Sequence, residues 1–291
     1  MKKTSSIIAA SRKTFHDALV SSNVLSISND GVASNADGSN APSKALALAV
    51  AKRLGAEIAP KLPAQSSGSL FETAVCDFLK STFPKLQHLR PGEWGIFNLG
   101  NHAETQTASF AQYSHLSYLA EVMRREKQLS TVLGNDYMVA PDIVVSRSLC
   151  SDDEINAPAK FVDATISTKA DLRAANGGLP LLHASISAKW TMRSDRAQNS
   201  RTEALNLIRN RKGHLPHIVV VTGEPLPSRL ASLALGTGDL DCVYHFALYE
   251  LLDAVHKYGA NGREDIVEQL EMLVNGKRLK DISDLPLDLS C

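Results

Sequence analysis

The chain has 291 residues, of which 44% are hydrophobic and 21% are charged, as in a globular protein with a sizeable core. Its 31 basic and 31 acidic residues cancel, so the net charge neither supports nor excludes a polyanionic partner such as DNA. The four cysteines form no CxxC pair, which argues against a zinc ribbon and a disulfide scaffold, and no run of about 18 apolar residues indicates a membrane span.

The N-terminal part of the chain predicts helices on either side of a long loop. A helix is expected over residues 5–19, and its apolar patch at 7–10 is too short for a signal peptide, so we expect a cytoplasmic protein. Residues 21–43 contain SNADGSN and are dominated by turn formers, which predicts a loop or a mobile arm. Two further helices are expected, one over residues 43–62 with Ser43 as its cap and one over 67–79.

The rest of the chain predicts strands that alternate with helices. The β-branched and apolar runs that predict strands are residues 93–99, 137–145 (interrupted by Pro141), 181–190, 217–222 and 241–246. The amphipathic stretches that predict helices are residues 108–132, 194–211 and those from 247 onward. The helix over 194–211 begins at a capping serine, and Gly213 follows its basic C-terminal end.

This order of elements predicts an α/β fold with a central mixed β-sheet flanked by helices. No internal repeat and no clean linker divides the sequence. We therefore expect a single domain over residues 1–291, with a loop-rich N-terminal arm at about 21–43.

Two carboxylates and a lysine stand at positions that suit phosphodiester hydrolysis. Asp142 follows Pro141 inside an apolar strand, where a charge is costly unless something binds it. Lys189 ends the next strand, and Glu203 lies 14 residues later in the following helix. Such groups can converge on Mg²⁺, with the lysine stabilising the developing charge or orienting the attacking water. A turn residue or a structural ion pair is the commoner role of a strand-end aspartate, so spacing alone leaves both interpretations open.

The start of the helix over 194–211 suits the recognition of DNA bases. Residues 193–212 hold six basic and two acidic side chains, and Arg193, Asp195 and Arg196 open the segment. Arginine binds guanine bidentately in the major groove, and aspartate accepts from the cytosine amino group, so this helix end could read adjacent C and G bases. A solvated basic helix with a capping aspartate explains the same pattern equally well.

A longer pattern carries a family resemblance. Its segments are GVASNADGSN, the helix with Phe71-Glu72, KLQHLRPGEW, PDIVV at 141–145, LLHASISAKWTMRSDRAQNSR, NLIRNRKGHLPHIVVVT, LGTGDLDCVYHFALYEL and NGKRLKDISDLPLDL. Over most of its length the chain resembles the NgoMIV-type restriction endonucleases, which belong to the CCGG-cutting group of the PD-(D/E)XK nuclease superfamily. The resemblance implies the restriction-endonuclease-like fold and type II cleavage of double-stranded DNA.

The resemblance also implies an active site. Asp142 looks like the metal-binding acid and Lys189 like the lysine of the superfamily motif. The superfamily usually places an acid two residues before this lysine, but Ser187 stands there, and a hydroxyl cannot replace a carboxylate as a Mg²⁺ ligand. The CCGG group takes this acid from the next helix, which matches Glu203.

Further roles follow from the same resemblance. Glu72 matches another active-site acid, and the metal ligands would be Asp142, Glu203 and the backbone carbonyl of Ala188, with two Mg²⁺ ions per active site. The residues that would read the inner CCGG are Arg193, Asp195 and Arg196. The residues that would contact the outer base pairs or the minor groove are Asp37, Gln65 and Arg229. The implied site is GCCGGC, cut after the first G to leave a four-base 5′ overhang.

The resemblance implies partners as well, namely a homotetramer that binds two DNA sites and a cognate DNA methyltransferase as the genetic partner. Two other functions fit part of the pattern. A structure-selective nuclease such as a junction resolvase needs the acids and the lysine but not the Arg-Asp-Arg segment, whereas a DNA-binding protein without catalysis needs only that segment. The GxG at 236–238 has no third glycine in register, and the nine histidines show no paired-ligand spacing. The sequence therefore favours the restriction enzyme, which uses both sets.

Overall fold

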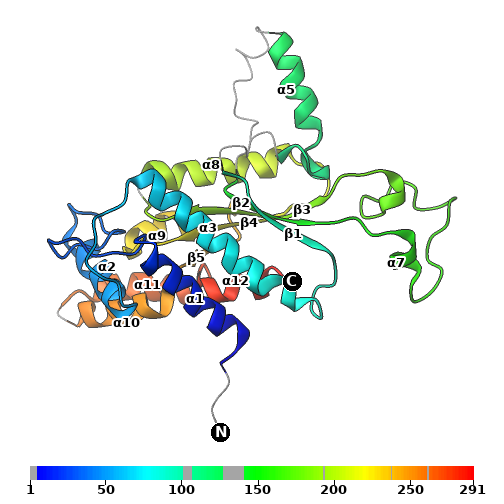
Figure 1. The fold of residues 1–291 in the computed structure, drawn as a ribbon. Helices are drawn as coiled ribbons and strands as arrows, with labels where there is room; N and C mark the ends of the chain where they lie inside the picture. Colours follow the sequence, from blue (N-terminus) through cyan, green and yellow to red (C-terminus); the bar gives the residue numbers. More distant parts are fainter. Residues whose placement is uncertain (1–4, 101–106, 127–140, 193, 237, 261) are drawn as a thin grey trace.

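Six strands form one mixed sheet in the described part of the chain, and their spatial order follows the sequence. The computed structural model describes residues 5–100, 107–126, 141–192, 194–236, 238–260 and 262–291 (Figure 1). The strands are β1 (Trp94–Asn98), β2 (Ile143–Arg147), β3 (Leu181–Lys189), β4 (His217–Thr222), β5 (Cys242–His245) and β6 (Leu279–Asp281). The pairs β1–β2 and β2–β3 are antiparallel, and β3 to β6 are parallel. The predicted mixed α/β fold is thus confirmed.

The central strands are buried on both faces, as parallel strands covered by helices require. From the second residue onward β4 is buried throughout, and β3 exposes part of only its two end residues. Val and Ile dominate β4, because their branched side chains pack well on a pleated surface. The strands predicted over 181–190, 217–222 and 241–246 therefore lie where the sequence placed them, to within one or two residues.

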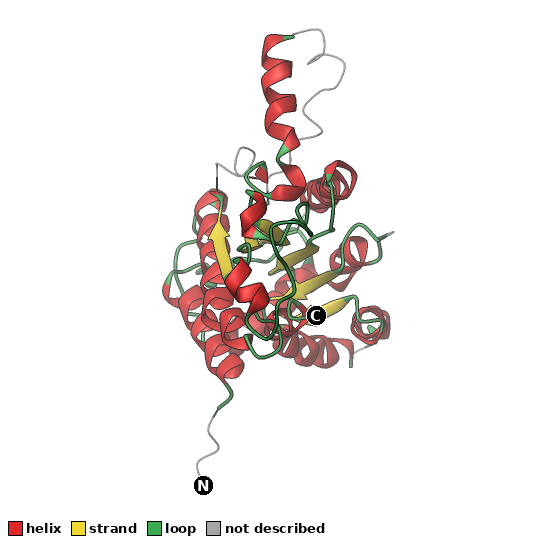
Figure 2. Cartoon of the chain, turned by 90° about the vertical axis from the view of Figure 1, so that its right-hand side faces the viewer, coloured by secondary structure: helices red, strands yellow, loops and turns green. Residues whose placement is uncertain are grey.

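Helices cover the sheet on both sides, as the turned view in Figure 2 shows. They are α1 (Ile7–Ser21), α2 (Ala41–Arg53), α3 (Ala64–Thr82), α5 (His115–Arg125), α7 (Asp152–Asn156), α8 (Ser194–Asn210), α9 (Pro227–Ala234), α10 (Leu248–Gly259), α11 (Glu264–Asn275) and α12 (Leu285–Asp288). Helix α3 packs against β1, β3 and α1, and α8 packs against α9. No helix of the described residues is long and apolar enough to cross a bilayer.

The helix predicted over 43–62 is wrong at both ends. Helix α2 begins at Ala41, because Asn40 is the N-cap and its side chain accepts from the Ser43 N–H at 2.8 Å. The helix ends at Arg53, just before Gly55, which adopts a left-handed φ of 75°. The chain then runs extended, and Ala59 donates to the Ile27 carbonyl at 3.0 Å.

The segment predicted as a loop or mobile arm is a packed loop. Between α1 and α2 it forms turns and short bridges, one of them between Ile27 and Ala33. Most of its apolar side chains are buried, with Val24 and Leu25 at most 1% exposed. Turn formers thus predicted the loop, but they gave no sign of the apolar contacts that hold it.

Two predicted elements extend into residues outside the described part of the chain. The helix expected over 108–132 is shorter at its start, where a 3₁₀ turn at Ala111–Tyr113 precedes α5, and α5 ends at Arg125, while the predicted end at 132 lies outside the described residues. The strand expected over 137–145 begins at Ile143, after Pro141, and runs on to Arg147, while its predicted start at 137–140 is not described. Both α5 and the segment around α7 project from the body of the molecule (Figure 1).

Candidate active site

Asp142 and Lys189 meet because of the register between β2 and β3. Ile143 pairs with Ile186 in this antiparallel ladder, so the residue before Ile143 lies beside the residues that follow Ile186. The Lys189 Nζ donates to the Asp142 Oδ2 at 2.7 Å, and both side chains are only partly exposed. Two residues 47 positions apart in the sequence thus form one ion pair.

The same carboxylate oxygen is held by two further groups. The Ala188 N–H donates to the Asp142 Oδ2 at 2.8 Å, and the Ser187 hydroxyl donates to it at 3.5 Å. The Ser187 hydroxyl also lies 3.3 Å from that of Ser200 on α8. Ser187 therefore orients Asp142 and contacts α8, a role that is consistent with a missing carboxylate at this position.

Glu72 and Glu203 approach the ion pair from α3 and α8. A cavity of about 280 Å³ is lined by Ala64, Gln65, Gly68, Glu72, Ala188, Lys189, Trp190, Asn199 and Glu203. Burial raises the pKa of Glu72 to about 7, and the Asp142 charge adds to the shift. Burial likewise raises the pKa of Glu203 to about 7, although Lys189 opposes the shift. The structure thus brings together four of the residues singled out for chemistry.

The charges around the cavity suit a divalent cation. Burial would lower the pKa of Lys189, but the Asp142 charge and hydrogen bond outweigh it and raise that pKa above its ordinary value. Above about pH 7, where Glu72 and Glu203 are charged, three carboxylates face a single lysine, which leaves an excess of negative charge. Among the described residues no three acidic, histidine or cysteine side chains form a ready-made metal cluster. Mg²⁺ needs only one or two protein carboxylates, since it keeps several of its waters, so Asp142, Glu203 and the Ala188 carbonyl fit it.

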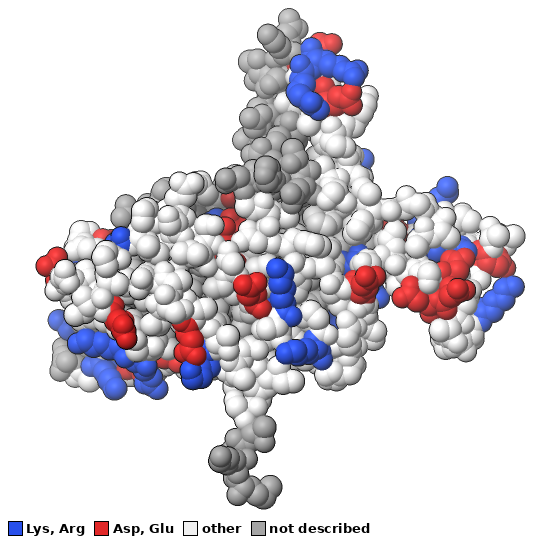
Figure 3. All heavy atoms as spheres, viewed as in Figure 1, with Lys and Arg blue, Asp and Glu red and all other residues white. Residues whose placement is uncertain are grey.

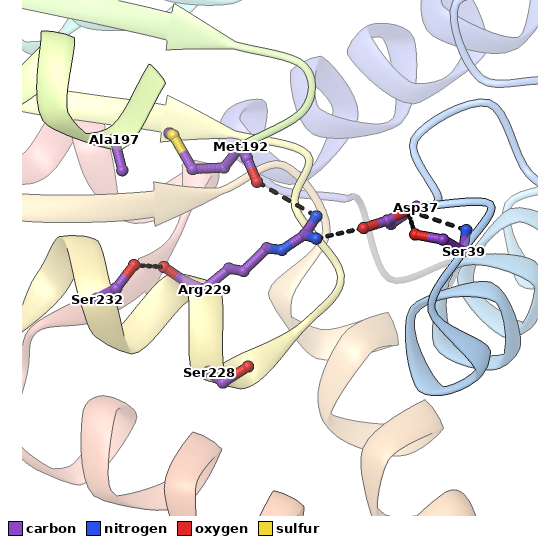
Figure 4. A pocket seen from close by; sticks show the side chains of 7 residues that line it. All are labelled: Asp37, Ser39, Met192, Ala197, Ser228, Arg229 and Ser232. Atoms are coloured by element: carbon purple, nitrogen blue, oxygen red, sulfur yellow. Dashed lines mark hydrogen bonds and ion pairs between the residues drawn. The ribbon is translucent and has the colours of Figure 1, made fainter. Parts of the chain in front are cut away.

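A second cavity, of about 540 Å³, lies beside the start of α8 (Figure 4). Arg229 on α9 points across it to Asp37, with which it forms an ion pair, and its guanidinium lies 3.5 Å from the Met192 carbonyl. Hydrogen bonds from Ser39 are the main cause that lowers the pKa of Asp37, and Arg229 adds to the effect. Asp37 and Arg229, predicted together as DNA contacts, therefore stand together across 192 residues of sequence.

Comparison with known proteins decides the family. The sequence pattern of the NgoMIV restriction enzyme family matches residues 15–291. The type II restriction enzyme NgoMIV of Neisseria gonorrhoeae is 53% identical over 280 residues, which cover 96% of this chain and 97% of that enzyme. The chain belongs to the NgoMIV restriction enzyme family. It is a type II restriction endonuclease, a site-specific deoxyribonuclease that binds double-stranded DNA.

Membership of the NgoMIV family confirms the predicted class of enzyme. It also confirms that the sheet and its flanking helices form the restriction-endonuclease fold expected from the sequence. The two other functions, a junction-selective nuclease and a DNA-binding protein without catalysis, are not those of the family.

The predicted base-reading segment lies at the start of α8. Arg193 lies outside the described residues, as do the side chains of Asp195 and Arg196, although the helix itself begins at Ser194. Gln65 lines the cavity with Glu72 and Lys189, and is not part of the cavity of Asp37 and Arg229. The prediction that placed Gln65 with the outer contacts gave no sign that it adjoins the candidate NgoMIV-family active site.

Sequence reasoning missed two side chains at these sites. Asn199 lines the cavity of Glu203 and lies one helical turn before it, so the i, i+4 spacing could have found it. Glu224 lies two residues after β4 and is 1% exposed. Asp142 was singled out as a charge within an apolar run, and Glu224, an acid that closely follows the apolar run of β4, could have been noticed by similar reasoning.

Proposed function

We propose that the chain cleaves both strands of double-stranded DNA at a palindromic site that contains CCGG, in a reaction that depends on Mg²⁺. The site we propose is GCCGGC, cut after the first G to leave a four-base 5′ overhang. The observation that carries the chemistry is the Asp142–Lys189 ion pair, with Glu72 and Glu203 facing the same cavity.

Each group in the cavity has a part in the proposed hydrolysis. Asp142, Glu203 and the Ala188 carbonyl would hold the metal, with two ions per active site. Bound Mg²⁺ would supply positive charge for the phosphate and lower the pKa of a water that it binds. Lys189 orients the attacking water or stabilises the charge that develops on the phosphate, and its contact with Asp142 places it at the site.

Base recognition is proposed for a separate set of residues. Arg193 and Arg196 read guanine and Asp195 reads cytosine in the inner CCGG. Asp37, Arg229 and Gln65 would contact the outer base pairs or the minor groove. Support comes from the sequence of the chain, in which the reader segment follows the strand of Lys189 directly. The groups for chemistry and the groups for base recognition are thereby close in the chain, at the end of β3 and the start of α8, but they are different side chains.

The test is cleavage of defined plasmids. The purified chain is incubated with one plasmid that carries GCCGGC and with another that lacks it, each with Mg²⁺ and with EDTA. We expect Mg²⁺-dependent cutting of the first plasmid alone, and sequencing of the ends should show the cut after the first G. Cutting at a CCGG with other flanking bases would contradict the proposed outer G·C pairs of GCCGGC. Cutting of branched DNA alone would contradict the proposed function as a whole.

A pair of lysine variants separates chemistry from folding. Lys189→Ala should abolish cleavage but leave specific binding of a GCCGGC duplex measurable. Lys280→Ala is the matched control, since Lys280 also forms a half-buried ion pair at 2.6 Å, with Asp288. It should cut at the wild-type rate. Cleavage by Lys189→Ala at near wild-type rate would show that the candidate site is not the active site.

We also propose the partners. A palindromic site is matched by a two-fold dimer, in which each chain reads one half-site. Two such dimers would form a homotetramer that holds two sites at once. A DNA methyltransferase of the same specificity would protect the DNA of the host.

A further inference from the structure

The turn that follows β4 links the Lys189 strand to the start of the reader segment. The Thr222 hydroxyl donates to the Lys189 carbonyl at 2.8 Å, and the Gly223 N–H donates to the same carbonyl at 3.3 Å. From the loop between α1 and α2, the Asn35 side-chain amide donates to the Gly223 carbonyl at 2.7 Å. The turn is thus fixed on both sides before it reaches Glu224.

Glu224 extends this support to the residue just before Arg193. One carboxylate oxygen accepts from the Met192 N–H at 3.1 Å, and the other accepts from the Leu226 N–H, also at 3.1 Å. The first oxygen also lies 3.7 Å from the Arg229 guanidinium. A side chain that is 1% exposed therefore holds the approach to α8, the approach to α9 and the arginine that faces Asp37.

A carboxylate suits the two N–H donors of Met192 and Leu226 better than an amide does. It accepts at both oxygens, whereas a glutamine would present a second donor to one of the two N–H groups. A buried charge is costly to fold, and Arg229 compensates it only in part at this distance. The contacts that the charge secures lie beside the proposed reader residues, which gives the charge a use beyond packing.

We propose that Glu224 is a positioning residue for base recognition, which holds the start of α8 and the Arg229 side chain in the arrangement that reads the DNA site. The inference rests on the proposed function and deepens it. Glu224 does not touch the bases itself. It acts through the Met192 backbone and through Arg229, so its loss should affect discrimination between sites more than affinity for DNA in general.

The test compares Glu224→Gln with a matched control, Glu250→Gln. Glu250 is also a largely buried glutamate bound to an arginine, Arg12 of α1, which it meets at 2.6 Å. Equilibrium binding without metal is measured for a GCCGGC duplex and for a duplex with one inner C·G pair replaced. For Glu224→Gln we expect the ratio of the two affinities to fall about tenfold or more, while affinity for the replaced duplex stays within about twofold. Glu250→Gln should keep the wild-type ratio.

A second variant keeps the proposal testable if Glu224→Gln does not fold. Glu224→Asp retains the charge but is one methylene shorter, so it can satisfy only one of the two N–H groups and should give an intermediate ratio. A wild-type ratio in the folded Glu224 variants would overturn the positioning role and leave the proposed function intact. If the wild-type chain itself does not distinguish the two duplexes, the proposed function fails with it.

Discussion

Ser187 marks the residue-level departure of this chain from the superfamily pattern. It stands two residues before Lys189, where an acid is usual, and its hydroxyl contacts Asp142 and Ser200. Glu203, one turn further along α8 than Asn199, faces the same cavity as Lys189. The geometry therefore fits a carboxylate supplied by the helix in place of one supplied by the strand.

Exchanging the position of this carboxylate tests that interpretation. Glu203→Gln should lose most Mg²⁺-dependent cleavage, because the amide has nearly the same shape but cannot replace a charged metal ligand. Adding Ser187→Glu returns a carboxylate to the usual position and should restore part of the activity. Rates of cleavage of a GCCGGC plasmid measure both effects, which we do not expect to be additive for residues that share a metal.

The control for this exchange is Glu271→Gln, which removes a carboxylate from an exposed ion pair with His256 on the surface of α10 and α11. It should cut at the wild-type rate. Normal cleavage by Glu203→Gln would show that Glu203 is a charge on the surface of α8 and not a metal ligand. Glu72 would then be the first candidate for the second metal-binding acid.

The ionisation of Glu224 predicts a pH dependence of recognition. Burial raises its pKa to about 7, against the opposing effect of Arg229, so the carboxyl is largely protonated at pH 6 and charged at pH 8.5. The charged groups around it are Arg229 from α9, and Asp37 and Lys61 from the segments on either side of α2. Discrimination between the two duplexes should therefore be greater at pH 8.5 than at pH 6.

Glu224→Gln provides the comparison for this pH dependence, because Glu72 and Glu203 of the proposed active site titrate in the same range. The part of the pH dependence that is due to Glu224 is the difference between the wild type and the variant. Identical pH profiles for the two proteins would show that the charge of Glu224 has no part in recognition.

At the scale of elements, the predictions succeeded where a local pattern governs the structure. The β-branched run HIVVVT predicts β4 because such side chains fill a buried pleated surface whatever the partner strand is. The end of α2 was predicted too late because the apolar pattern continues after Arg53, whereas the left-handed Gly55 ends the helix. Helix was predicted from residue 247 onward without an end, and the structure has α10 and α11 there; strand β6, which has only three residues, was not predicted.

The candidate site was predictable as a set of residues but not as a geometry. Asp142 could be found as a charge within an apolar run, Lys189 as a charge at the end of a predicted strand, and Glu203 as an acid on the helix that follows. Their contacts depend on strand register and on the packing of α8, which periodicity does not specify. Glu224 shows the limit most clearly, since its contacts with two backbone N–H groups carry no sequence signal even where the residue itself could be noticed.

The turn after β4 gives a prediction at this scale. A Cβ on Gly223 would lie 2.5 Å from the Trp190 ring and 2.7 Å from the Trp190 carbonyl oxygen, so Gly223→Ala must displace the turn from β3. We expect a loss of unfolding free energy of about 1–3 kcal/mol, measured by denaturant titration. Gly38→Ala is the control, because nothing lies within 4 Å of the added methyl, and it should change stability by no more than about 0.5 kcal/mol. Equal stability of the two variants would contradict the close contact.

At the scale of the whole molecule, the net charge does not indicate DNA binding. The net charge is zero, and the face in Figure 3 shows acidic and basic side chains interspersed, with an acidic group on the projecting α7 segment. Affinity for DNA must therefore come from local groups such as Arg229 and the basic residues of α8. The proposed number of chains rests on the two-fold symmetry of a palindromic site and on the family resemblance.

The proposed assembly predicts how the number of sites in a plasmid affects cleavage. A two-fold dimer suffices to read one palindrome, so a tetramer would leave two DNA-binding clefts that are filled fastest when both sites lie on one molecule, at high effective concentration. Plasmids with two GCCGGC sites should be cut faster than plasmids with one, and added duplex that carries the site should accelerate cutting of the one-site plasmid. Sedimentation at micromolar concentration should show four chains. A mass of one or two chains, with equal rates on both plasmids, would remove the tetramer and leave the dimer as the unit that reads and cuts a single site.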